Sequence, residues 1–218
     1  MEFEHVKPMD IEKRSMEIIG QELAEKGITF AGRQRRTSLN VSFIRRQILN
    51  MQIPLLFSEH AVEKAKEALR AGATIVTDTK MAWSGINKRT LENLHGKACN
   101  FISDEDVAEA ARQHGFTRSA ASMDKAASLP GPLIFAIGNA PTALIRLYEL
   151  IEEGKLAPAL IIGVPVGFVN VVQAKELIME TDVPYIIARG RKGGSNVAAA
   201  ICNALLYDLD SSRGMKKS

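Results

Sequence analysis

Short apolar runs alternate with helical stretches along the second half of the chain. Three runs are continuously apolar, at Leu133–Ile137, Ala159–Ile162 and Tyr185–Ala188. Stretches with helical periodicity follow them at residues 141–153, 171–179 and 194–207. Continuous apolar runs of this length are typical of strands that are buried on both faces of a sheet. The alternation therefore predicts parallel strands joined by right-handed crossovers, which is an α/β fold in the form of a three-layer α/β/α sandwich.

The first half of the chain shows the same alternation less regularly. Asp10 can cap a helix that ends at Gly27, and Ser58 can open a second helix that ends at Gly72. Further elements are expected at residues 74–77 (strand), 98–102 (a weaker strand), from Asp104 or Asp106 to Gly115 (helix) and 117–129 (helix). We expect a sheet of about five strands. Residues 1–210 are predicted to form a single domain, and residues 211–218 a polar C-terminal tail.

Composition excludes several classes of protein. The net charge of +3 and the aromatic content of 6% do not favour nucleic-acid binding, which requires a concentrated basic face. No apolar run approaches the roughly 20 residues of a membrane span, and residues 1–10 lack the apolar core of a signal peptide. Cys99 and Cys202 are far apart, as expected for free thiols in the cytoplasm. The cysteines and the four histidines lack metal-ligand spacing, so no metal site is predicted; these histidines are His5, His60, His95 and His114.

Each of the three apolar strands leads directly into a glycine-rich loop. The loops span residues 137–142, 163–169 and 189–195. Ligands of open α/β sheets bind beyond the carboxyl ends of the strands. Glycine lets main-chain N–H groups approach a ligand, and the N-terminus of the following helix attracts anions. The three loops are therefore predicted to form one pocket for an anionic ligand.

Individual polar residues near these loops allow two interpretations. Arg191 and Lys192 could bind a carboxylate or a phosphate, or could be exposed residues of an ordinary strand-to-helix turn, and spacing alone favours neither. Thr117 could cap a helix while Arg118 reaches a carboxylate, although a solvated arginine is the simpler interpretation. The chain has neither a Walker A pattern nor a G-x-G-x-x-G motif, so nucleotide binding lacks support.

The loop sequences also carry a family resemblance. Ala136–Leu144, Pro165–Val169 and Gly190–Ser195 resemble the hallmark blocks of the precorrin-8X methylmutases, also known as cobalt-precorrin-8 methylmutases. Shorter blocks in the same order are similar too: Lys13-Arg14-Ser15, Gly72-Ala73 before Asp78, Gly85-Ile86 and Thr117-Arg118-Ser119. One block departs from the family, because Gln173-Ala174-Lys175 stands where Glu-Ser-Lys is usual.

The resemblance implies a function. Members of this family move a methyl group from C-11 to C-12 of a corrin precursor in cobalamin biosynthesis. They need no cofactor, and a histidine is thought to protonate the ring. The family also implies a flavodoxin-like, mostly parallel sheet and a homodimer. The substrate and product are polycarboxylates, and the residues expected to bind them are Arg14, Ser15, Thr117, Arg118, Asn139, Thr142, Gly167, Arg191, Lys192 and Ser195.

The family's histidine is absent from its expected place. A block resembling Arg-Val-Ile-His-Thr-Thr-Ala-Asp should precede Phe57-Ser58, but residues 31–55 are basic and contain no histidine. Val41–Pro54 can be encoded so that a shifted reading frame, which joins the third base of each codon to the first two bases of the next, translates to Val-Ile-His-Thr-Thr-Ala-Asp-Phe-Glu-Tyr-Ala-Asp-Thr. At some positions the genetic code leaves little choice of residue in the shifted frame, and Phe43-Ile44 can give only His or Tyr. We therefore hypothesise a compensated frameshift in this segment, with the catalytic histidine expected at the position of Phe43 or Ile44.

If the segment is instead a real insert, the chain lacks the proton donor and should be a poor mutase. A non-catalytic corrinoid-binding or carrier protein is then the alternative function. A nucleotide-dependent α/β enzyme is a third possibility, which the missing phosphate motifs disfavour.

Overall fold

The computed structural model describes residues 53–210, and residues 1–52 and 211–218 lie outside the described part. The predicted helix from Asp10 to Gly27, the candidate residues Arg14 and Ser15, and the polar tail all lie outside it. So do Phe43 and Ile44, at which the family histidine is expected.

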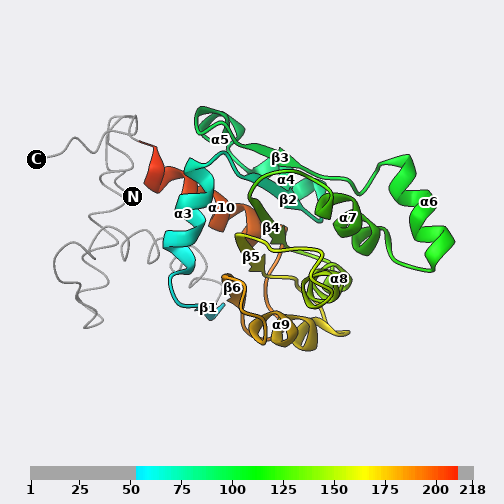
Figure 1. The fold of residues 1–218 in the computed structure, drawn as a ribbon. Coiled ribbons are helices and arrows are strands. Elements are labelled where there is room, and N and C mark those ends of the chain that lie inside the picture. The colour runs from blue at the N-terminus through cyan, green and yellow to red at the C-terminus, as the bar shows by residue number, and fades with distance from the viewer. Residues whose placement is uncertain (1–52, 211–218) are drawn as a thin grey trace, which may run out of the picture.

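The described residues form one sheet with helices around it (Figure 1). Its strands are β1 (Leu55–Phe57), β2 (Thr74–Thr77), β3 (Lys97–Cys99), β4 (Leu133–Ile137), β5 (Leu160–Gly163) and β6 (Tyr185–Ala188). The helices are α3 (Ala61–Arg70), α4 (Lys80–Gly85), α5 (Lys88–Asn93), α6 (Glu105–His114), α7 (Arg118–Ala127), α8 (Pro141–Glu152), α9 (Val171–Met179) and α10 (Ser195–Leu209).

The strand order is that of a doubly wound sheet. The six strands lie in the order β1-β6-β5-β4-β2-β3. All neighbouring pairs are parallel except β1 with β6, which is antiparallel. The five parallel strands, numbered along the chain, have the order 5-4-3-1-2, which is the flavodoxin-like arrangement read from the other side. The predicted mostly parallel, flavodoxin-like sheet is confirmed, and β1 adds an antiparallel edge strand.

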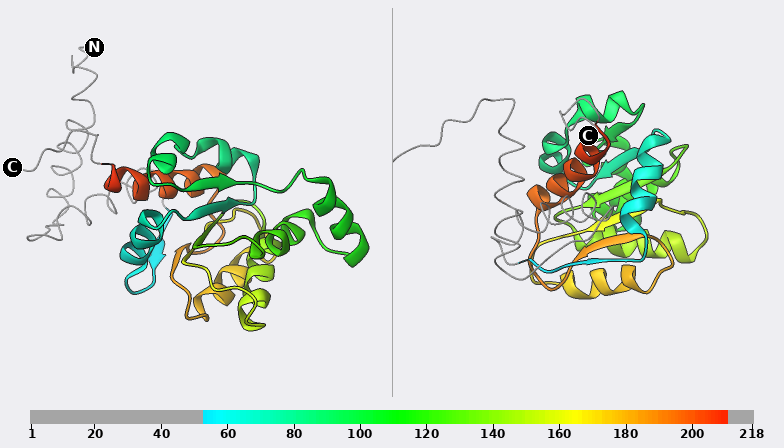
Figure 2. Two further views of the ribbon diagram at one scale, coloured as in Figure 1. Left: turned by 45° about the horizontal axis from the view of Figure 1, so that its top comes forward. Right: turned by 90° about the vertical axis from the view of Figure 1, so that its left-hand side faces the viewer.

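Alternate residues of each strand point to opposite faces of the sheet, and each face is covered by helices. In β4, Ile134 packs into one core and Phe135 into the other. Helices α3, α4, α5 and α10 cover the first face, whereas α7, α8 and α9 cover the second. This confirms the three-layer sandwich. Helix α6 lies at the periphery (Figure 1 and Figure 2) and packs mainly on α7.

Most of the predicted elements in the described part are present, with shifted ends. The strand expected at 98–102 is β3 and begins at Lys97. The prediction that Ser58 opens the second helix was wrong, because α3 begins at Ala61 and its N-terminal cap position is His60. The Ser58 hydroxyl instead accepts a hydrogen bond from the Tyr185 N–H at 2.9 Å, so it serves the β1–β6 pair. Strand β1 and helices α4 and α5 were not predicted.

Candidate active site

The candidate site lies at the carboxyl edge of the sheet, where β2 and β4 are neighbours although β3 separates them in the chain. The crossover after β2 leads to α4 on one face of the sheet, and the crossover after β4 leads to α8 on the other. Such a switch point opens a crevice in which α/β proteins bind ligands. The loops after β2, β4, β5 and β6 all begin at this edge because the four strands are parallel.

A buried carboxylate fills the centre of this edge. Asp78 follows β2 and is 1% exposed. Its oxygens accept hydrogen bonds from the main-chain N–H groups of Gly138 (2.9 Å), Asn139 (2.8 Å) and Ala140 (2.7 Å), at the start of α8. Burial raises the pKa of the Asp78 carboxyl, and the three N–H donors act in the opposite direction. These three amides are therefore not available to an external anion, contrary to the anion-binding role expected for the backbone of the first glycine loop.

The other two glycine loops are held against each other. The Gly194 N–H donates to the Val164 carbonyl at 2.9 Å, and the Gly167 N–H donates to the Arg191 carbonyl at 3.2 Å. A Cβ on Gly193 would lie 2.8 Å from the Val164 carbonyl carbon, a distance that real side chains do not adopt. Glycine is therefore required at Gly193 because two backbones meet there.

A buried lysine also stabilises the loop after β6. Lys175 on α9 is 1% exposed. Its Nζ donates to the carbonyl oxygens of Gly190 at 2.6 Å and of Lys192 at 3.0 Å. Burial lowers the pKa of Lys175 to about 8. Lys175 belongs to the block in which the family usually has Glu-Ser-Lys, and it was not among the predicted site residues.

The loop after β2 is joined to the start of α10. Thr79 caps α4 by accepting the Ala82 N–H at 3.1 Å. The same Thr79 hydroxyl is hydrogen-bonded to the Ser195 hydroxyl at 2.8 Å. A Cβ on Gly138 would lie 2.8 Å from the Ser195 nitrogen, so the first and third glycine loops are in close contact. The predicted site residue Ser195 therefore has a defined structural role at this edge.

The segment from Thr117 to Arg118 reaches the edge from the second face. Thr117 caps α7 by accepting the Ala120 N–H at 3.2 Å, as predicted. Its hydroxyl is also hydrogen-bonded to that of Thr142 at 2.8 Å, in the first turn of α8. Arg118 is exposed. The segment from Gly138 to Thr142 thus contacts both Ser195 and Thr117, although α7 and α10 cover opposite faces of the sheet.

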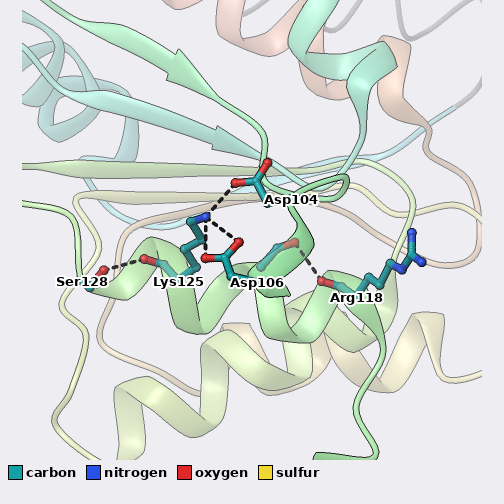
Figure 3. Close-up of polar contacts among 6 residues, drawn as sticks. Asp104, Asp106, Arg118, Lys125 and Ser128 are labelled. Carbon is teal, nitrogen blue, oxygen red and sulfur yellow. Dashed lines mark hydrogen bonds and ion pairs between the residues drawn. The ribbon is translucent and has the colours of Figure 1, made fainter. Parts of the chain in front are cut away.

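Ion pairs join α7, which begins at Arg118, to its neighbours α6 and α8. Lys125 on α7 donates to Asp104 at 2.7 Å and to Asp106, which ties α7 to the start of α6 (Figure 3). These hydrogen bonds raise the pKa of Lys125 and lower that of Asp106. Arg146 on α8 binds Asp124 on α7 at 2.8 Å. In Figure 3 the Arg118 guanidinium points away from the acidic pair, and Arg118 is an exposed residue.

Exposed side chains at the edge are basic, polar and apolar. Asn139, Arg118, Arg191 and Lys192 are exposed. Phe168 and Val169, in the loop after β5, are 80% and 79% exposed. The Arg191 guanidinium lies 5.6 Å from the centroid of the Phe168 ring. The edge therefore offers cations beside apolar surface, which suits a large ligand with both an apolar body and carboxylates.

The described histidines are poorly placed to act at this edge. His60 follows β1, which is antiparallel, and His95 precedes β3, so both lie toward the amino ends of the parallel strands. His114 ends α6, and its ring is 6.0 Å from that of Phe116. In contrast, the chain enters β1 at the carboxyl edge, because Leu55 pairs with Ala188 at the end of β6. The described part of the chain therefore begins at the candidate site, with Ile53 and Pro54 directly before β1.

The predicted site residues in the described part gather at one edge, and the sequence missed three that organise them. Asp78, Thr79 and Lys175 hold the glycine loops in place. Of these, Asp78 and Lys175 had a signal in the sequence, because each stands in or beside a block that resembles the family, whereas Thr79 had none. Within residues 53–210 no three His, Cys, Asp or Glu side chains are grouped to hold a metal ion.

These features define an open, doubly wound α/β protein with a basic and partly apolar site at its carboxyl edge. Among the helices of residues 53–210, none has the length and apolarity needed to cross a membrane. A family model described as precorrin-8X methylmutase matches residues 10–208. The chain belongs to the precorrin-8X methylmutase family.

Individual relatives agree with this assignment. The chain is 39% identical over 209 residues to the cobalt-precorrin-8 methylmutase of Priestia megaterium, an alignment that covers 94% of this chain and 90% of that protein. It is 49% identical over 156 residues to the cobalt-precorrin-8 methylmutase of Salmonella typhimurium, covering 71% of this chain and 72% of the relative. The crystal structure of a precorrin-8X methylmutase from Thermus thermophilus is similar, with a TM-score of 0.71 and 33% identity over 91% of this chain and 96% of that one.

Proposed function

We propose that this protein is an isomerase of cobalamin biosynthesis. It converts precorrin-8X, or its cobalt form, by moving a methyl group from C-11 to C-12 of the macrocycle, which gives hydrogenobyrinic acid or cobyrinic acid. Membership of the methylmutase family carries this proposal. The reaction is intramolecular, so substrate and product have the same atoms and no co-substrate is needed. No comparison favours the alternative of a corrinoid carrier.

We propose that the macrocycle binds at the carboxyl edge of the sheet. The exposed cations Arg118, Arg191 and Lys192 suit carboxylates around its rim, because arginine offers paired donors to a carboxylate. The same edge carries Asn139, Thr142 and Gly167. It also includes Thr117, whose hydroxyl is hydrogen-bonded to that of Thr142, and Ser195, whose hydroxyl is hydrogen-bonded to that of Thr79. Arg14 and Ser15 are proposed to complete the site on the strength of the family resemblance alone.

The proton donor is proposed to come from the segment before Ile53. The family resemblance supports this origin, and so does the start of the described chain at the carboxyl edge, where the Pro54 carbonyl accepts the Arg189 N–H at 2.8 Å. A histidine suits the step because its pKa lies near the operating pH. The family histidine is expected at the position of Phe43 or Ile44, so the native protein should carry it there.

Anaerobic incubation of the purified protein with each substrate form tests the function. Turnover should change the absorption spectrum of the macrocycle while its mass stays constant, because methyl migration alters conjugation without changing composition. His114→Gln should retain activity, since His114 ends the peripheral helix α6 and its ring lies near that of Phe116. Loss of activity in that variant would instead assign the proton donor to His114, and tight product binding without turnover would favour the carrier.

We further propose a cytoplasmic homodimer. The exposed Phe168 and Val169 give apolar area that a second subunit or the substrate would cover. Both cysteines, Cys99 and Cys202, are free thiols, which suits a reducing compartment. Light scattering of the purified protein should give twice the mass of the chain. A monomer at micromolar concentration would refute the dimer without affecting the proposed reaction.

A further inference from the structure

Lys175 is a fully buried lysine, and its hydrogen-bond partners within residues 53–210 do not include a carboxylate. Lysine is almost never fully buried unless it is paired. Its two hydrogen bonds go to main-chain carbonyl oxygens, those of Gly190 and Lys192, at 2.6 Å and 3.0 Å. A buried ammonium costs solvation energy, so a simple structural purpose would be served better by an apolar residue.

The position of these carbonyls gives the lysine a specific role. Gly190 and Lys192 flank Arg191, whose own carbonyl accepts the Gly167 N–H at 3.2 Å. Three successive carbonyl groups are therefore held, two by Lys175 and one by the loop after β5. Fixing the peptide groups on both sides of Arg191 also fixes the direction in which its side chain leaves the backbone.

We propose that Lys175 is a positioning residue for the anionic ligand, acting through the Arg191 backbone rather than by touching the ligand. The proposal rests on the proposed function, because it takes the ligand to be a corrinoid polycarboxylate at the carboxyl edge. Through Lys175, α9 would therefore influence how tightly the site binds its ligand.

The charge of Lys175 adds a second observable. Burial lowers its pKa to about 8, so the ammonium loses its proton in mildly alkaline solution. The other titratable or charged groups on α9, on β6 and in the loop after β6 are Glu176, Tyr185, Arg189, Arg191 and Lys192. Hydrogen bonds from an ammonium are stronger than those from an amine. Affinity for a polycarboxylate should therefore fall as the pH rises through about 8.

A double-mutant cycle on ligand binding tests the proposal. Lys175→Met, Arg191→Met and the double variant are titrated with hydrogenobyrinic acid or cobyrinic acid, so the test does not depend on turnover. Losing two charge-assisted hydrogen bonds in Lys175→Met should raise the Kd about tenfold. The double variant should bind about as weakly as Arg191→Met alone, because the lysine acts through that arginine. Lys155→Met removes an exposed lysine that is paired with Glu153 and should leave the Kd unchanged.

The outcomes separate the proposal from the proposed function. A wild type that does not bind the corrinoid overturns both. A wild type that binds while Lys175→Met has an unchanged Kd, or while the two losses are additive, overturns the role of Lys175 alone. If Lys175→Met does not fold, the wild-type Kd is measured across pH. It should rise several-fold between about pH 7 and about pH 9.5, and this step should be absent in Arg191→Met. A flat wild-type profile overturns the proposal.

Discussion

Substituting Gly193 with alanine should separate the loop after β6 from the loop after β5. The new Cβ would lie 2.8 Å from the carbonyl carbon of Val164 and 2.9 Å from the carbonyl oxygen of Pro165. Both contacts are with backbone, so no side chain can rotate away. The loops after β5 and β6 must therefore move apart.

The cost can be worked out from the contacts between the loops. Separation breaks the hydrogen bonds from Gly194 to Val164 and from Gly167 to Arg191, each about 1 kcal/mol. Overpacking of a close contact adds about 1–3 kcal/mol. The free energy of unfolding should therefore fall by about 3–5 kcal/mol, and the Tm of a chain of this size by roughly 10 °C.

Gly190→Ala is the matched control in the same loop. Gly190 has a φ of +75° and open space where a Cβ would be, so only backbone strain opposes alanine. That strain is about 1–2 kcal/mol. Thermal and urea unfolding of both variants give the comparison. Equal losses of stability in Gly193→Ala and Gly190→Ala would show that close packing of the two loops is not what requires glycine at Gly193.

Three further predictions concern buried charges and the unmatched segment. Asp78→Asn replaces an acceptor oxygen with an NH2 group that faces N–H donors, so urea unfolding should show a loss of at least about 3 kcal/mol; a loss below about 1 kcal/mol would contradict a buried carboxylate at this position. Lys175 should make the wild type more stable relative to Lys175→Met as the pH rises from about 8 toward 10.5, because the unfolded lysine still binds its proton there and the folded one does not. Burial raises the pKa of Cys202 to about 12, and the resulting loss of stability at high pH occurs in both proteins and cancels in the difference; a constant difference would refute the lowered pKa. The intact mass of the natural protein should differ from that of the given sequence, with a histidine at the position of Phe43 or Ile44, and agreement between the two masses would mean that the insert is real.

The sequence could predict elements whose pattern is local. Strands β4, β5 and β6 are continuous apolar runs because helices cover both of their faces. The Thr117 cap was also predictable, since a capping side chain bonds within its own first turn. Strand β1 was missed because it has only three residues and pairs with a strand far along the chain.

The organising residues of the site could not be predicted from local pattern. Asp78 binds amides about 60 residues further along the chain, and no periodicity reports such a contact. Lys175 lies on a helix, where lysine usually marks the solvent face, but here its stem is buried and its ammonium reaches a loop. The family resemblance pointed to the three glycine loops in a different way, because it compares whole blocks rather than single side chains.

The buried carboxylate of Asp78 occupies the switch point of this flavodoxin-like sheet. In nucleotide-binding members of this architecture, the amides at the switch point receive a phosphate group. Here the chain supplies its own anion to those amides, and a phosphate placed there would meet a negative charge at hydrogen-bonding distance. Under the proposed function, external anions are bound instead by side chains on separate loops. Cations on separate loops would suit a wide, flat molecule that carries its charges around a rim better than a compact phosphate ester.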